Sequence, residues 1–226
     1  RNADANFITE SEFLKILEFF NTDGRPFLRE TYLILILMYR VGLRISESVS
    51  IKLRDLQILD DISGEVSVSL IIRDNQYVEG KTTDSRRVLP LELLLRKSEL
   101  VSLIRFVREK QVERTSLSAM LFSTDSDGKR PFFESLFYEP LKKAFEYVCG
   151  TNNIRGQHLR HSFDNHVLLS LLKVDPPFKT PQHLDQLALS ITDGPSRKKL
   201  YFLSMLTGHA SPSTTLRNYV HVQDLL

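Results

Sequence analysis

The most informative stretch of the chain is Gln157-His158-Leu159-Arg160-His161-Ser162-Phe163. It lies at the start of residues 158–173, for which the apolar spacing predicts a helix. Taken alone, the stretch predicts only a helix with a polar face. Read as chemistry, it presents an arginine whose planar guanidinium can donate two hydrogen bonds to a pair of phosphate oxygens.

Three other short segments carry residues of related chemistry. Residues 42–47 read Gly-Leu-Arg-Ile-Ser-Glu and place a carboxylate three positions after an arginine, on the same side of a helix. Residues 79–81 read Glu-Gly-Lys, and a lysine in such a turn can donate a proton to a departing oxygen. Residues 206–221 contain Leu-Thr-Gly-His, Ser-Thr-Thr and Tyr-Val-His. Each segment alone also has a purely structural interpretation. The first is consistent with a solvated helix start, the second with a charged hairpin tip, and the third with a buried tyrosine on an amphipathic helix.

The order of these segments is more informative than any one of them. An arginine, a turn lysine, a second arginine, a Gly-His pair and a tyrosine near the end follow one another along the chain. In these boxes the chain resembles the tyrosine recombinases, or phage-integrase family, from about Phe7 to Val222. The resemblance implies the tyrosine-recombinase catalytic fold, which is mixed and mainly α with a small antiparallel β-sheet.

The resemblance also assigns roles to five matching positions. It implies that the Tyr219 hydroxyl attacks a DNA phosphodiester, forms a 3′-phosphotyrosyl link and releases a 5′-hydroxyl, with no metal or cofactor. Arg44 and Arg160 then hold the non-bridging oxygens and stabilise their growing charge. Lys81 acts as the general acid for the leaving oxygen, and His209 donates a hydrogen bond to the phosphate.

One position departs from the family pattern, which has histidine three residues before the second arginine. Gln157 stands there, and His158 is only two residues before Arg160. Adjacent helical residues point about 100° apart, so we expect Gln157 to donate a hydrogen bond in the site without shuttling a proton. We expect Glu47 to orient the first arginine and His161 to support the site by a hydrogen bond, and His158 is a further candidate for a supporting role.

The remaining periodicity predicts the other elements. Alternating β-branched residues predict strands at 66–72 and 87–91, joined through a polar turn at 74–85 into an antiparallel hairpin or small sheet. Thr9 and Glu12 form an expected capping box. Helices are expected at about 9–21, 28–41, 44–53, 97–113, 132–149, 158–173, 196–207 and 213–220.

Composition and length favour one catalytic domain over residues 1–226, with 173–199 a candidate insertion. The family's N-terminal core-binding domain is expected to be absent from this chain. The formal net charge is only +2, so any DNA-binding charge must be concentrated on one face. The single cysteine, Cys149, is expected to be structural. Only some of the candidate contacts to DNA phosphates are expected to touch DNA, and Arg86, Arg87, Arg155 and Lys198 are singled out. The full set is Lys52, Arg54, Lys81, Arg86, Arg87, Lys129, Arg130, Arg155, Arg197, Lys198 and Lys199.

The resemblance implies double-stranded DNA with a specific recombination site as the partner. It also implies a monomer when free, a homotetramer on DNA, and a bacterial cytoplasmic location at the nucleoid, with no membrane. Two DNA-related alternatives stay open. Gln157 is compatible with a catalytically impaired DNA-binding relative, and a type IB topoisomerase-like enzyme would share the same chemistry. A protein-interaction domain with chance matches is the third alternative.

Overall fold

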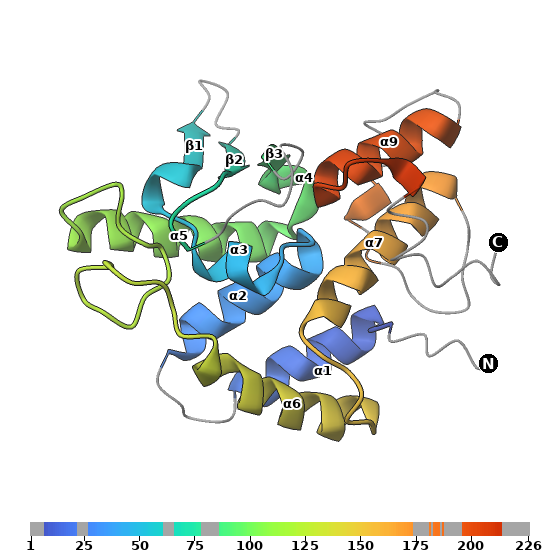
Figure 1. The fold of residues 1–226 in the computed structure, drawn as a ribbon, viewed down its shortest axis with the longest axis horizontal. Coiled ribbons are helices and arrows are strands. Elements are labelled where there is room, and N and C mark those ends of the chain that lie inside the picture. The colour runs from blue at the N-terminus through green and yellow to red at the C-terminus, as the bar shows by residue number, and fades with distance from the viewer. Residues whose placement is uncertain are drawn as a thin grey trace.

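The computed structural model describes residues 7–21, 27–60, 66–77, 86–173, 181, 183–185, 187 and 196–213. Figure 1 shows the small sheet and α5 on one side of the molecule, α7 and α9 on the other, and α2 and α3 between them. The elements are α1 (Glu10–Asn21), α2 (Leu28–Arg40), α3 (Ile45–Val49), η1 (Leu53–Asp55), β1 (Leu56–Asp60), β2 (Val66–Ile72), β3 (Arg87–Pro90), α4 (Leu91–Leu94), α5 (Lys97–Glu113), α6 (Ser135–Cys149), α7 (Gln157–Leu172) and α9 (Ser196–Thr207).

The first helix begins at the predicted capping box. The Thr9 amide and hydroxyl both donate to Glu12 Oε2 at 2.7 Å, and the Glu12 amide donates back to Thr9 Oγ1 at 3.3 Å. These bonds satisfy amides that the first turn of a helix leaves unpaired. Phe13, Ile16 and Phe20 then repeat on one face and are buried.

The sheet is antiparallel, in the order β1-β2-β3. Its two expected strands are confirmed, and β1 is an additional strand that the sequence pattern does not predict. The helix expected at 44–53 is wrong beyond Val49. There the chain leaves the helix because Ile51 and Leu53 pair with a distant segment: the Leu121 amide donates to the Ile51 carbonyl at 2.7 Å and the Leu53 amide to the Ala119 carbonyl at 3.0 Å.

The helix α2 forms the centre of the core, and residues 33–40 along it are buried. Arg40 on this helix is 1% exposed and is paired with two carboxylates, Glu10 of α1 and Glu99 of α5. A buried guanidinium needs such partners because desolvation of an unpaired charge is costly. The cluster therefore fixes three helices around one cation.

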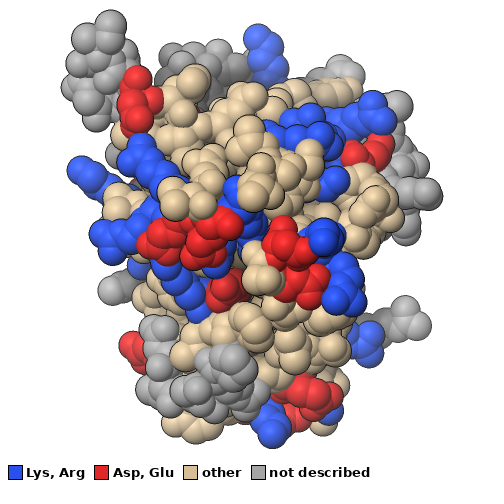
Figure 2. Space-filling view, turned by 90° about the vertical axis from the view of Figure 1, so that its left-hand side faces the viewer, with Lys and Arg blue, Asp and Glu red and all other residues tan. Residues whose placement is uncertain are grey.

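The exposed charges are interleaved rather than segregated on the face shown in Figure 2. Along α5 and the segment that follows it, Arg108 lies 3.2 Å from Asp60, and Lys110 lies 2.6 Å from Glu113. Further pairs are Arg29–Glu109, Lys129–Asp127 and Arg130–Asp125. Each basic side chain in these pairs has an acidic neighbour that offsets its charge.

No helix within the described ranges is long and apolar enough to cross a membrane. Most of the candidate insertion at 173–199, and most of the helix expected at 213–220, lie outside the described residues. Cys149 ends α6 and is half-buried, and burial raises the pKa of its thiol to about 11.

Candidate active site

The first arginine of the site is placed by a tight loop between α2 and α3. Gly42 in this loop has φ +70°, and a Cβ there would lie 2.3 Å from the ring of Phe163 on α7. Only glycine satisfies both the backbone angle and this close approach. Arg44 is the residue before α3, in extended conformation. The loop therefore brings Arg44 against the first half of α7.

Glu47 holds Arg44 in place. Its Oε2 accepts the Arg44 backbone N–H at 2.8 Å, and its Oε1 accepts the Arg44 guanidinium at 2.9 Å. The same carboxylate binds Arg87 of β3 through two hydrogen bonds of 3.0 and 3.1 Å. A third guanidinium, that of Arg160 on α7, lies 3.6 Å from Glu47 Oε2.

Three guanidiniums thus surround one carboxylate whose side chain is 3% exposed. Burial alone would raise the pKa of Glu47, but Arg87, Arg160 and Arg44 outweigh it and lower the pKa to about 2. Glu47 is therefore ionised at neutral pH. The cluster has a surplus of positive charge, since three cations face one anion.

Arg160 is almost completely buried, and it links the loop before α3 to the end of α9. Its NH1 donates to the Gly42 carbonyl at 2.8 Å, and its NH2 donates to the Thr207 carbonyl at the end of α9. Burial lowers the pKa of Arg160. The same NH2 lies 3.1 Å from Nε2 of His209.

The proton on His209 follows from its partners. Arginine can only donate, so Nε2 of His209 accepts the bond from Arg160 and carries no proton. Nδ1 then carries it and donates to Thr207 Oγ1 at 2.9 Å, while that hydroxyl donates to the Leu203 carbonyl. Burial and the cations Arg160, Arg44 and Arg87 lower the pKa of His209 to about 3. The imidazole is neutral in this state.

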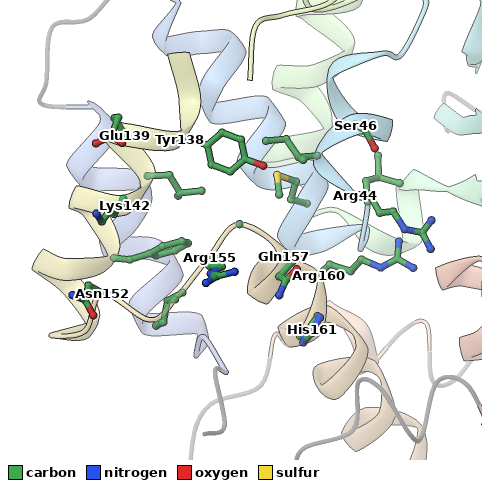
Figure 3. A pocket seen from close by; sticks show the side chains of 17 residues that line it. Arg44, Ser46, Tyr138, Glu139, Lys142, Asn152, Arg155, Gln157, Arg160 and His161 are labelled. Carbon is green, nitrogen blue, oxygen red and sulfur yellow. The ribbon is translucent and has the colours of Figure 1, made fainter. Parts of the chain in front are cut away.

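A recess of about 870 Å³ opens beside Arg44 and Arg160. Figure 3 shows their guanidiniums lying near each other at one end, with Gln157 and His161 below them. Its apolar lining comes from α2, α3 and α6 and from the loops before α3 and α7. Its other polar lining residues are Ser46, Tyr138, Glu139, Lys142, Asn152 and Arg155.

The two residues that compete for the unusual position differ in placement. Gln157, the first residue of α7, is exposed and lines the recess. His158 is buried and turns away to the helix start, where its Nδ1 accepts the Arg155 amide at 2.7 Å. Its ring meets that of His161 edge-on at 5.4 Å. The structure thus points Gln157, and not His158, toward the recess.

The other predicted site residues are placed as follows. Lys81 and Tyr219 lie outside the described residues. Arg86 is exposed and paired with Asp74 at 2.8 Å, and Lys198 is exposed on α9. Within the described ranges, no group of three or more His, Cys, Asp and Glu side chains is arranged to hold a metal ion.

Arg87 was expected among the surface contacts to DNA, but its side chain is only 5% exposed and lies inside the cluster. Its Nε also donates to the Leu206 carbonyl at 2.8 Å, which links β3 to α9. The strand pattern carried a signal for this position: residues two apart share a face, and Leu89 is buried. A second buried polar residue near the cluster, Asp164, was not singled out from the sequence.

A family model named the phage integrase family matches residues 6–172 of this chain. The chain belongs to the phage integrase family. The match contains the two arginine segments and Lys81, and it ends before α9. No curated protein sequence matched the chain.

Solved recombinases share the fold of this family member. The XerH site-specific recombinase in a post-cleavage complex with palindromic difH substrate aligns with a TM-score of 0.59 and 15% identity, over 93% of this chain and 48% of its own. The XerA recombinase aligns with a TM-score of 0.59 and 17% identity, over 96% and 61%. The Tn1549 transposon integrase in complex with transposon right end DNA aligns with a TM-score of 0.54 and 17% identity, over 95% and 61%. The chain thus spans about half to three fifths of these relatives.

Proposed function

We propose that this chain is the catalytic domain of a tyrosine-type site-specific recombinase that cuts and rejoins double-stranded DNA through a 3′-phosphotyrosine intermediate. The observation that carries the proposal is the cluster of three guanidiniums around the single carboxylate of Glu47, open to a recess. A phosphodiester carries one negative charge and gains a second as it approaches the transition state. A preformed surplus of positive charge stabilises the transition state more than the substrate.

In the proposed reaction, the Tyr219 hydroxyl loses its proton to solvent, its oxygen bonds to the scissile phosphorus and the bond to the 5′ oxygen breaks. Tyrosine has an ordinary pKa of ~10, so it attacks only where cationic neighbours favour the phenolate. Arg44 and Arg160 hold the two non-bridging oxygens, and Lys81 gives a proton to the leaving 5′ oxygen. Attack of a 5′-hydroxyl from a partner strand reverses these steps and rejoins the DNA, so bond energy is conserved in the intermediate.

His209 acts on the same phosphate in this proposal. In the free protein its Nε2 accepts a hydrogen bond from Arg160. An arriving phosphate competes for that arginine and places a negative charge beside the imidazole. The charge raises the pKa of His209 from its low starting value, which allows Nε2 to gain a proton and donate to the phosphate.

A nicked-duplex assay tests the proposal. The duplexes carry randomised sequence or the ends of the native element, a 5′ label, and a nick just 3′ of each candidate scissile position. Cleavage releases a short 5′-hydroxyl fragment that diffuses away and traps the covalent complex. The intact chain should give a labelled adduct that survives denaturation, and Tyr219→Phe should give none. Absence of an adduct from every pool, with DNA binding retained, refutes the cleavage function.

Gln157 favours the second candidate, a DNA-binding relative that does not cut, because an amide cannot shuttle a proton. The same assay separates the two, since a non-cutting relative binds the duplexes and leaves no adduct. Relaxation of supercoiled plasmid without any preferred site would indicate a topoisomerase-like enzyme instead. We further propose that the chain is a monomer when free and acts as a homotetramer on two DNA sites.

A further inference from the structure

Asp164 is a buried carboxyl that the proposed chemistry does not use. It lies on α7 one turn after Arg160, and none of its surface is exposed. Neither carboxylate oxygen has a hydrogen-bond partner among the residues that the structure describes. An ionised carboxylate in such a place is strongly disfavoured, so the group either takes up a proton or draws a cation toward itself.

The cations that act on Asp164 come from the active-site cluster. Arg160 acts from its own helix, Arg87 from β3, and Arg44 from the start of α3. The spacing of four residues places Arg160 and Asp164 on the same face of α7. Burial raises the pKa of Asp164 to about 7, and these three cations only partly oppose it.

The other charged and titratable groups around α7 have partners elsewhere. Arg40 of α2 is held by Glu10 and Glu99, and Lys199 of α9 donates to the Leu171 carbonyl at 2.9 Å. On α7 itself, Nε2 of His166 lies 2.8 Å from the Tyr39 hydroxyl, and burial lowers the pKa of His166 to about 4. Within the described ranges, Glu47 and His209 contact the cluster, and His158 and His161 lie against each other on the first turns of α7.

We propose that Asp164 is a positioning residue that controls, through its proton, how much positive charge Arg160 presents to a bound phosphate. Protonated, Asp164 is neutral and the cluster keeps its full surplus of charge. Ionised, it cancels one charge and pulls the Arg160 guanidinium back along α7, away from the recess. The proposal rests on the proposed function only in that the anion is taken to be the scissile phosphate.

Two consequences follow from electrostatics. Ionisation of Asp164 as the pH rises through neutrality weakens anion binding at the cluster and slows cleavage. Conversely, an anion bound at Arg160 disfavours a second negative charge beside it, so binding raises the pKa of Asp164 and the protein takes up a proton. A residue that served only to fill space would give neither effect.

The variant that tests this is Asp164→Asn, which keeps the shape and removes the titration. We would follow inorganic sulfate, which stays doubly charged throughout, through the NMR signals of the arginine Nε–H groups between about pH 6 and pH 9. Near pH 9, the intact chain should bind sulfate roughly tenfold more weakly than Asp164→Asn does. The ratio of variant to wild-type cleavage rates on the nicked duplex should rise by a similar factor over the same range.

Asp55→Asn is the matched control, because Asp55 is also buried but is paired with Arg73 and accepts the Lys52 amide at 3.0 Å. It should change both readouts by a factor that is the same at every pH. A variant-to-wild-type ratio for Asp164→Asn that is flat across this range refutes the proposal. If Asp164→Asn does not fold, Asp164→Ala supplies the neutral state and the same criterion applies.

The two readouts separate this proposal from the proposed function. A pH-dependent sulfate ratio without any DNA adduct leaves the role of Asp164 intact and removes the recombinase assignment. An adduct that forms with flat ratios for both sulfate and cleavage supports the recombinase and removes the role of Asp164.

Discussion

Glu47 is a single carboxylate on which three guanidiniums depend. It fixes Arg44 through both its backbone and its side chain, and it binds Arg87 through two bonds. Removal of one partner from a buried ion pair is far more costly than the net worth of the pair, because the remaining charges lose their compensation. Glu47 therefore affects both stability and phosphate binding.

Glu47→Gln should lower the free energy of unfolding by roughly 3 kcal/mol near pH 7 and reduce cleavage by about 100-fold or more. The pKa of Glu47 is depressed in the fold, so its stabilisation is present above the ordinary value of 4.5 and is lost as the pH falls toward about 2. Urea unfolding at several pH values should therefore show the difference between the two proteins shrinking in acid. Glu113→Gln, which breaks an exposed pair with Lys110, should cost under ~0.5 kcal/mol.

Asp164 affects the free energy of unfolding with the opposite pH dependence to that of Glu47. Its pKa is raised in the fold, so the protonated form is favoured there and the carboxyl destabilises the protein increasingly as the pH rises from 3.8 to about 7, with no further change above. Asp164→Asn should therefore gain stability relative to the wild type over this interval, by up to roughly 4 kcal/mol at ~1.4 kcal/mol per pH unit. Thermal unfolding in matched buffers measures it. Equal curves would show that the carboxyl of Asp164 titrates in the folded protein as it does in the unfolded chain, which contradicts the prediction.

Gln157→His restores the residue type that the family pattern has at this position. Gln157 already points into the recess, so an imidazole can occupy the same place. We expect cleavage of the nicked duplex to be unchanged or faster, because histidine adds proton transfer to hydrogen bonding. A large loss of rate would show that the Gln157 side chain has a different role.

At the scale of elements, the loop between α2 and α3 determines how closely α7 approaches. Gly42 and Gly150 both have positive φ, at +70° and +67°, but only at Gly42 does a neighbouring side chain occupy the place of a Cβ. Alanine at either position is strained by the left-handed backbone, but only alanine at Gly42 also meets a neighbouring side chain. Comparison of the two variants therefore separates backbone strain from steric contact.

Gly150→Ala should lower stability by about 1 kcal/mol, from the left-handed backbone alone. Gly42→Ala should cost about 3 kcal/mol or more, because the methyl group also meets the Phe163 ring. Chemical denaturation of the two variants gives the comparison, and the cleavage assay should show a further loss for Gly42→Ala. Equal costs would mean that Phe163 moves aside freely.

The elements also show which parts of the fold the sequence predicts. Long periodic segments such as α5 were predicted at Lys97–Glu113, and the capping box located the start of α1 within one residue. β1 was missed because Leu56–Asp60 is short and lacks a clear alternation. The break after Val49 was missed because it depends on pairing with residues 119–121, which no local pattern encodes.

At the scale of the whole molecule, the sequence predicted which residues lie at the candidate site better than it predicted which of them contact one another. The order of motifs was sufficient to choose Arg44, Arg160 and His209, which the structure brings together around Glu47 and Thr207. It did not indicate that Arg87 is interior or that Asp164 lies beside the cluster. Those facts depend on how β3, α7 and α9 pack, which follows from the tertiary fold.

The distribution of charge over the molecule predicts which basic residues bind DNA. Lys142 and Arg155 line the recess, whereas Lys129 and Arg130 are exposed residues paired with Asp127 and Asp125. Lys142→Ala and Arg155→Ala should each weaken DNA binding and reduce the slope of log affinity against log salt by about 1. The corresponding alanine variants at Lys129 and Arg130 should leave the slope unchanged. Fluorescence anisotropy across a salt series measures both, and equal slopes in all four variants would place the DNA elsewhere.

The contacts from Arg87 and Arg160 to the carbonyls of Leu206 and Thr207 also concern the timing of synthesis. A nascent chain that has emerged only as far as α7 already contains both arginines and Glu47, yet these two acceptors are still inside the ribosome. Each guanidinium then lacks one of the bonds that fix its direction. The cluster around Glu47 is therefore completed only when α9 reaches it, so we expect a polypeptide still under synthesis to bind a phosphate weakly there.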